Sequence, residues 1–118
     1  MIDSHLHVWE RSRGHYSWLS PDLGALYDDF PPGIACDELD RAAVDGAILV
    51  QADDTLDDAK YMFAASRTHE AVWGVVPWLP LDSPLQAEKL LELYKAEPAF
   101  CGVRQLVHDD PRTDFYRL

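Results

Sequence analysis

The sequence predicts an α/β protein with about four parallel β/α units, and three observations support this fold class. Short apolar runs of strand length alternate with longer segments of helical periodicity. The strand-like runs are apolar throughout, as is typical of parallel sheets that are covered on both faces. The chain has 118 residues, of which 47% are hydrophobic, enough for one folded domain with a core. A doubly wound sheet and a barrel both fit this pattern.

The expected elements follow one another along the whole chain. Strands are expected at residues 2–8, 46–52, 71–81 and 100–107, and helices at residues 35–44, 57–70 and 83–97. The second strand is the apolar run GAILVQA, and the second helix has Ala59, Met62 and Phe63 at helical spacing. The third helix opens on Ser83 and Pro84, residue types that favour a first turn. This order gives parallel strands joined by helices.

A long loop is expected at residues 9–34, after the first strand. Prolines and glycines interrupt regular structure in it, and it carries five aromatic residues: Trp9, Tyr16, Trp18, Tyr27 and Phe30. Long loops in compact domains are usually lids or binding segments, which is one interpretation of these aromatic residues. The other is that they cover an edge of the core.

Composition excludes several classes of partner. There are 21 acidic and 10 basic residues, which give a formal net charge of -11 and oppose binding to nucleic acid or anionic lipid. We expect no signal peptide and no membrane span, and therefore a cytoplasmic protein. Cys36 and Cys101 are far apart and outside any C-x-x-C motif, so reduced thiols are expected.

The first strand carries the motif HLH. Side chains alternate along a strand, so Asp3, His5 and His7 should share one face. The Cα atoms of the two histidines would lie roughly 6.5 Å apart, which lets both rings reach one metal ion. The alternative is a pair of polar residues at a strand end that hydrogen-bond to solvent or a neighbour.

Polar or aromatic residues follow the other strands as well. Parallel β/α folds bind ligands at the carboxyl ends of their strands, where this sequence places Gln51, Trp78, Arg104 and His108. A buried arginine needs an anion, so Arg104 could face a structural carboxylate or a substrate oxygen. His108 could equally be an exposed loop residue. A dinucleotide site is not expected, because no G-x-G-x-x-G motif follows the first strand.

Several stretches together resemble a known family. They are IDSHLHVWE, GHYSWL, LYDDFPP, VDGAILVQAD, VWGVVPWLPL and FCGVRQLVHDDP. In this order they resemble the amino-terminal half of the amidohydrolase-related (amidohydrolase 2) family of metal-dependent hydrolases, and most closely its sugar-lactone and pyrone-dicarboxylate lactonases. The resemblance implies a partial (β/α)₈ TIM barrel over residues 1–118, with the long loop at 9–34.

The resemblance also implies roles for individual residues. His5 and His7 would be metal-site and catalytic histidines, with zinc or manganese as the ion, and Arg104 a substrate-orienting and catalytic cation. Gln51, Trp78 and His108 are expected to contact the substrate, a small lactone or carboxylic acid. The implied reaction is attack of an activated water on the carbonyl of a lactone. Without a tightly held metal, the two histidines would instead hydrogen-bond the carbonyl.

The length of the chain departs from the family. A complete barrel takes roughly 250 residues, and no position of the chain can be matched to the family's later histidine and aspartate. A non-catalytic fragment or assembly module therefore stays open as an alternative to the hydrolase. An amidohydrolase-type decarboxylase is a further alternative, since the resemblance also includes barrels that perform that reaction. An open sheet with two unpaired edges is expected to form a homodimer or a higher oligomer.

Overall fold

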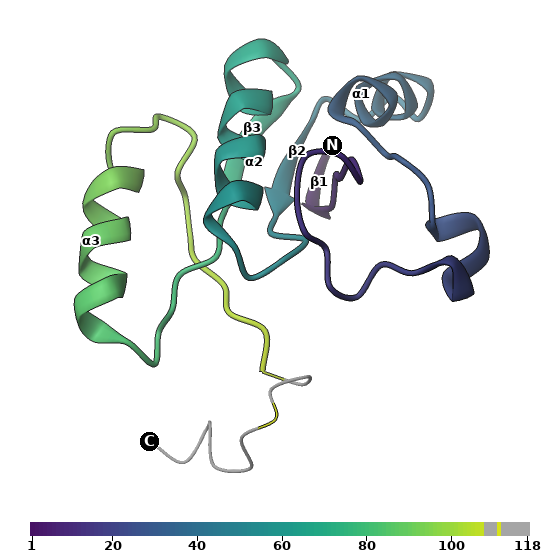
Figure 1. Cartoon of the computed structure of the whole chain (residues 1–118). Helices are drawn as coiled ribbons and strands as arrows, with labels where there is room; N and C mark the ends of the chain where they lie inside the picture. The colour runs from purple at the N-terminus through teal and green to yellow at the C-terminus, as the bar shows by residue number, and fades with distance from the viewer. Residues whose placement is uncertain (108–110, 112–118) are drawn as a thin grey trace.

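The computed structural model describes residues 1–107 and residue 111, so His108 lies outside the described residues. Its elements, in chain order, are β1 (Ile2–Leu6), the 3-10 helix η1 (Pro21–Leu26), α1 (Pro32–Arg41), β2 (Gly46–Val50), α2 (Leu56–Thr68), β3 (Val72–Val76) and α3 (Pro84–Tyr94) (Figure 1). Strands and helices alternate as the sequence predicts. The predicted α/β class is therefore confirmed.

The three strands form one parallel sheet in the order β1-β2-β3. Ile2 of β1 pairs with Gly46, and Leu49 of β2 pairs with Val75 of β3. The strands are parallel because a helix returns the chain after each of them, which is the usual way to connect parallel neighbours. All three strands therefore end at the same edge of the sheet.

The predicted fourth strand at residues 100–107 is wrong as a continuous element. This segment runs parallel to β3 and its extension, but it pairs only at two isolated bridges, Val75 with Phe100 and Trp78 with Arg104. Around Val75 the ladder is regular, with hydrogen bonds to the backbone of residues 99 and 101. The next amide of that ladder would belong to Pro77, which has no N–H. The pairing breaks there and resumes where the Arg104 amide donates to the Pro77 carbonyl, at 3.0 Å.

The main core lies between the sheet and the helices α2 and α3. Its buried members are Val8, Leu49, Ala59, Met62, Phe63, Ala65, Val72, Val75, Leu79 and Tyr94. The α2 face predicted from helical spacing supplies Ala59, Met62 and Phe63. This packing holds the sheet rigid and so fixes the edge at which the strands end.

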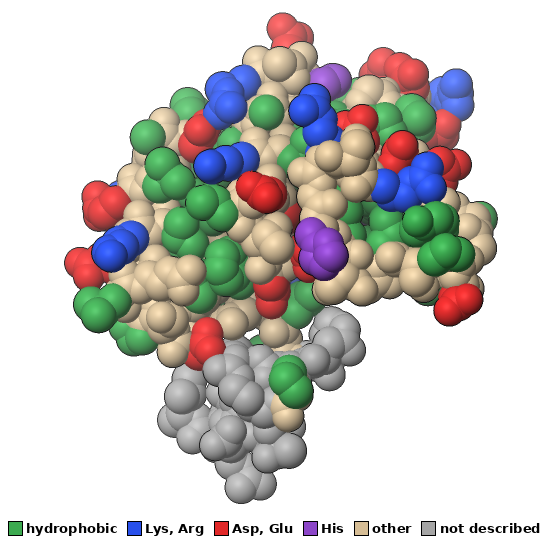
Figure 2. All heavy atoms as spheres, in the orientation of Figure 1, with side chains coloured by type: hydrophobic (Ala, Val, Ile, Leu, Met, Phe, Trp, Pro, Cys, Tyr) green, Lys and Arg blue, Asp and Glu red, His purple; other side chains and the backbone are tan. Residues whose placement is uncertain are grey.

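Helix α1 begins earlier than the sequence predicts, at Pro32 in place of residue 35. Pro31 has extended backbone angles and forms the N-cap, and Pro32 takes the first helical position, where a missing N–H costs nothing. The aromatic loop consequently covers residues 9–31 and contains η1. None of the described helices is long and apolar enough to cross a membrane. Acidic side chains are scattered over the face seen in Figure 2 and do not form one patch.

We expect Tyr94→Phe to lower the free energy of unfolding by about 1–2 kcal/mol. The Tyr94 side chain is 1% exposed, and its hydroxyl donates to the Trp78 carbonyl at 2.9 Å. Urea unfolding would measure the change. Tyr16→Phe is the matched control, since the buried Tyr16 hydroxyl has no hydrogen-bond partner among the described residues. A Tyr94→Phe cost no larger than that of Tyr16→Phe would contradict the prediction.

Candidate functional site

The two histidines of the HLH motif lie against each other at the end of β1. Their Nε2 atoms are 3.1 Å apart, and the ring centroids are 4.8 Å apart with the ring planes at 81°. The nearby carboxylate of Asp3 accepts the His5 backbone amide at 3.0 Å. The alternation of side chains along the strand therefore brings two imidazole nitrogens to one point.

The protonation of His7 is set by the neighbouring strand. Its Nδ1 lies 2.9 Å from the carbonyl oxygen of Val50, at the end of β2. A carbonyl only accepts hydrogen bonds, so Nδ1 carries the proton and Nε2 keeps a lone pair. Burial is the main cause that lowers the pKa of His7, and the charges of His5 and Arg104 lower this pKa further. The hydrogen bond to the Val50 carbonyl acts in the opposite direction and raises it. The neutral ring thus presents Nε2 to His5.

A cavity of about 370 Å³ opens beside His7. It brings together three of the residues predicted from strand ends, His7, Gln51 and Arg104. The remaining lining residues are Trp9, Trp18, Leu26, Ala52 and Leu106. The walls are mostly apolar with a few polar groups, as is usual for sites that bind small molecules.

Trp78, a further predicted site residue, is not part of this lining. Its backbone bridges to Arg104, and its carbonyl accepts the Tyr94 hydroxyl. Its indole nitrogen is buried and has no hydrogen-bond partner among the described residues. Trp78 therefore places the Arg104 segment beside β3 without reaching the cavity wall.

Arg104 enters the cavity wall from the segment that follows α3. Its amide donates to Pro77, and its carbonyl accepts the Leu79 amide at 3.2 Å. The ion pairs of the described residues do not include Arg104. Its charge acts on His7, since it lowers the pKa of that ring. Within the described part of the chain, no structural carboxylate neutralises this guanidinium.

Gln51 is the polar residue that follows β2, and its side chain is 1% exposed. The side-chain amide nitrogen donates to the Asp54 carboxylate. The amide oxygen is buried and has no hydrogen-bond partner among the described residues. Because a buried acceptor without a partner is costly, this oxygen marks a place where a ligand or a water would bind.

The aromatic loop supplies the apolar walls of the cavity. The Trp18 indole nitrogen donates to the Ala52 carbonyl at 2.6 Å, and the Trp9 indole nitrogen donates to the Asp28 carbonyl at 2.9 Å. The two indoles meet edge to face, with ring centroids 5.2 Å apart. Both indoles are thus held by backbone carbonyls, which leaves their apolar surfaces to shape the cavity.

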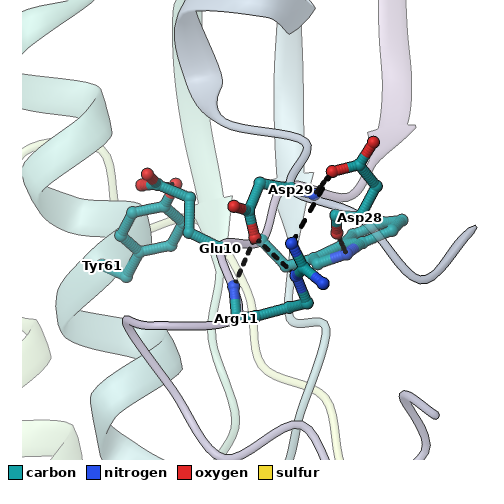
Figure 3. Close-up of polar contacts among 6 residues, drawn as sticks. Glu10, Arg11, Asp28, Asp29 and Tyr61 are labelled. Atoms are coloured by element: carbon teal, nitrogen blue, oxygen red, sulfur yellow. Dashed lines mark hydrogen bonds and ion pairs between the residues drawn. The ribbon is translucent and has the colours of Figure 1, made fainter. Parts of the chain in front are cut away.

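Polar contacts fasten this loop at its base (Figure 3). Arg11 donates to the Asp29 carboxylate through its backbone amide at 2.8 Å and through Nε at 3.3 Å, and Asp28 lies on the other side of the guanidinium. The hydrogen bond from the Arg11 backbone amide is the main cause that lowers the pKa of Asp29. From the other side of the loop base, the Tyr61 hydroxyl of α2 donates to Glu10 at 2.6 Å. The Arg11 contacts therefore hold the two ends of the loop together, and the Tyr61 contact ties the start of the loop to α2.

Similar proteins were found in sequence and in structure. L-fucono-1,5-lactonase of Burkholderia ambifaria is 30% identical over 108 residues, which is 92% of this chain. An amidohydrolase of Burkholderia multivorans superposes with a TM-score of 0.78 and 26% identity, both in a structure with bound HEPES and in one with bound zinc. The resemblance to the amidohydrolase family is confirmed. No family model matches the chain.

The amidohydrolase-like chain spans only part of these relatives. It covers 37% of the length of the lactonase, and 38% and 43% of the two amidohydrolase structures. The two structural superpositions include 93% and 98% of the residues of this chain. The likeness therefore extends over nearly all of this chain.

The histidine pair fits part of a metal site. Two nitrogen ligands of a tetrahedral ion, each at 2.0–2.1 Å, lie about 3.4 Å apart, close to the 3.1 Å between the two Nε2 atoms. The Nδ1–H of His7 bonded to a backbone carbonyl is the usual support of a histidine ligand. Among the described residues no group of three or more His, Cys, Asp or Glu side chains could hold a metal. The spacing of the two Nε2 atoms is therefore compatible with two of the ligands of one metal ion.

Five lining residues are not among the site residues that the sequence predicts: Trp9, Trp18, Leu26, Ala52 and Leu106. For Trp9 and Trp18, the density of aromatic residues in the loop is the signal in the sequence, and it indicates the whole segment and no single indole. Which indole reaches the cavity depends on the loop's path, which the pairing of Trp9 with Phe30 determines.

Proposed function

We propose that this chain is the amino-terminal part of an amidohydrolase-superfamily hydrolase with a partial (β/α)₈ TIM barrel over residues 1–118, and that the enzyme opens a lactone ring. The observation that supports it most is the convergence of two imidazole nitrogens, one with its lone pair fixed by Val50, beside a cavity that contains Arg104. The lactonase relative and the two amidohydrolase structures support the same class of reaction.

Each group has a separate task in this proposal. His5 and His7 would hold a divalent ion, zinc or manganese, together with ligands from elsewhere. Polarisation of the carbonyl and activation of water are the chemistry that such an ion supplies. The Arg104 guanidinium binds the oxygen that gains negative charge, or a carboxylate of the substrate. The Gln51 amide oxygen accepts a hydrogen bond from a substrate hydroxyl.

The aromatic walls fit a cyclic substrate. Trp9 and Trp18 offer apolar ring surfaces, and Leu26 of η1 adds a further apolar side chain to the lining. A small ring can pack against these walls while its polar groups reach Arg104 and Gln51. Such packing also keeps bulk water away from the reacting carbonyl, which strengthens the electrostatic effect of the arginine.

A panel of substrates would test the proposal. The zinc-loaded protein is expected to release acid from sugar lactones, followed with a pH indicator, and to release no carbon dioxide from aromatic carboxylic acids. Carbon dioxide release without lactone hydrolysis would replace the lactonase proposal by the decarboxylase. No turnover of either class, in a protein that binds zinc, would favour the non-catalytic module.

One observation favours an assembly role alongside catalysis. Trp73 of β3 is 53% exposed and Ile2 of β1 is 44% exposed, so apolar side chains of the sheet face solvent. Exposed apolar side chains on a sheet are typical of surfaces that bind another polypeptide segment or another subunit. The expected homodimer or higher oligomer stays a prediction.

A further inference from the structure

A buried carboxylate ties the start of α2 to the segment after β2. Asp58 is fully buried, and its Oδ2 accepts the Ala52 amide at 2.9 Å and the Asp53 amide at 3.4 Å. Its own amide donates to the side chain of Thr55, the N-cap residue of α2, at 3.1 Å. One side chain therefore fixes the turn between β2 and α2 from within the core.

This turn forms part of the cavity. Gln51 and Ala52 both line it, and the Ala52 carbonyl accepts the Trp18 indole N–H at 2.6 Å. The Asp58 carboxyl thus bonds to the N–H of the same residue whose C=O holds Trp18. Through Ala52, it determines where two walls of the cavity lie, although it does not line the cavity itself.

The surroundings of the Asp58 carboxyl allow both its neutral and its ionised form near pH 7. Oδ1 is buried and has no hydrogen-bond partner among the described residues, and the same holds for the Tyr16 hydroxyl. The pKa of Asp58 is raised to about 7, chiefly by burial. The negative charges of Asp53 and Asp54 in the same turn also raise this pKa, whereas the two hydrogen bonds from backbone N–H groups lower it. Among the described residues, Tyr16 of the loop and Tyr94 of α3 also sense the charge of Asp58, which raises the pKa of both hydroxyls.

We propose that Asp58 is a positioning residue of the cavity, and that its protonation state sets the geometry of residues 51–53 and, through Ala52, of Trp18. The ionised carboxylate is the stronger acceptor and draws the two amides in, whereas the neutral carboxyl releases them. The proposal concerns the shape of the cavity wall and does not depend on the reaction proposed for the cavity.

The Trp18 indole N–H reports on this coupling directly. In ¹⁵N-labelled protein its signal can be assigned by its loss in Trp18→Phe, among the signals of the chain's 4 tryptophans. In the wild type we expect this signal to move with pH, with an inflection near pH 7. In Asp58→Asn the movement should be lost, because the amide side chain keeps an acceptor for the two N–H groups and does not titrate.

Two further variants sharpen the experiment. Asp57→Asn removes an exposed carboxylate of the same helical turn, and it should titrate like the wild type. Asp53→Asn removes a neighbouring negative charge that raises the pKa of Asp58, so the inflection should move to lower pH. Histidines titrate in the same range, and the comparison of Asp58→Asn with Asp57→Asn assigns the inflection to one group.

Thermal unfolding provides a second reading of the same titration. The folded pKa of Asp58 lies above its ordinary value of 3.8, so the stability contributed by the neutral carboxyl is full below about pH 4. It is lost as the pH rises through about 7. The melting temperature of the wild type should fall over this range more than that of Asp58→Asn.

The outcomes separate clearly. A Trp18 signal that does not move with pH in the wild type, or one that moves identically in Asp58→Asn, overturns the proposal. If Asp58→Asn does not fold, an inflection that stays in place in Asp53→Asn overturns it. No substrate is used, so the result is independent of the lactone assay.

Discussion

Replacing His5 and His7 together by alanine is expected to weaken zinc retention by more than about 100-fold, the upper end of the cost of losing a supporting partner of a metal ligand. The reason is that the two Nε2 atoms converge at 3.1 Å at the end of β1, and the Val50 carbonyl leaves the His7 Nε2 with a lone pair for the proposed ion. Elemental analysis after dialysis would measure the bound zinc. The far-ultraviolet circular dichroism spectrum should stay unchanged, because neither histidine belongs to the buried core.

His69→Ala is the matched control for this experiment. His69 caps the end of α2 and hydrogen-bonds to Thr68 and Ala65 through its Nδ1, outside the cavity lining. Its loss should leave the zinc content at the wild-type level. Equal zinc in the wild type and in the double variant would remove His5 and His7 from the proposed metal site.

Arg104→Met is expected to lower kcat/KM on a responsive lactone by roughly 10²–10³, the size of effect seen when a donor to a developing oxyanion is removed. Methionine keeps much of the packing of the side-chain stem and removes the guanidinium. The melting temperature should change little, since Arg104 contributes to no ion pair of the described residues. Steady-state kinetics and thermal unfolding on the same preparation would provide both numbers.

Arg67→Met provides the comparison. Arg67 forms an exposed ion pair with Glu97 at 2.7 Å, a kind of contact that contributes little to stability. Activity and melting temperature should both stay near the wild-type values. If Arg104→Met chiefly prevents folding while Arg67→Met does not, Arg104 has a structural role.

The order of strands and helices follows from the sequence because local patterns decide it. Continuous apolar runs such as GAILV form strands, and the spacing of Met62 and Phe63 forms the buried face of a helix. The break in the fourth predicted strand depends on register. Pro77 interrupts the pairing because it lies at the position whose N–H would bond to the neighbouring segment near Cys101. Which residues of the two segments lie opposite each other is a long-range property that no local pattern reveals.

The candidate site divides in the same way. The shared face of His5 and His7 follows from the period of a strand. The bond from His7 to Val50 depends on how β1 and β2 are aligned, and the loop residues reach the cavity only through long-range contacts. Asp58 resembles an ordinary solvent-exposed acidic residue in the first turn of a helix, and only the packed structure shows that its carboxyl is buried.

The pairing of Trp9 with Phe30 lets the aromatic loop change in length and sequence independently of the sheet. Two backbone hydrogen bonds, of 3.0 and 2.8 Å, join its ends, so a change of length between them does not pull on β1. Lengthening a loop whose ends are already joined costs little, since the entropy of closure grows only slowly with length. Insertions near η1 can therefore reshape the cavity rim while His5 and His7 stay in place. In this architecture, the shape of the cavity rim can diversify without disturbing β1.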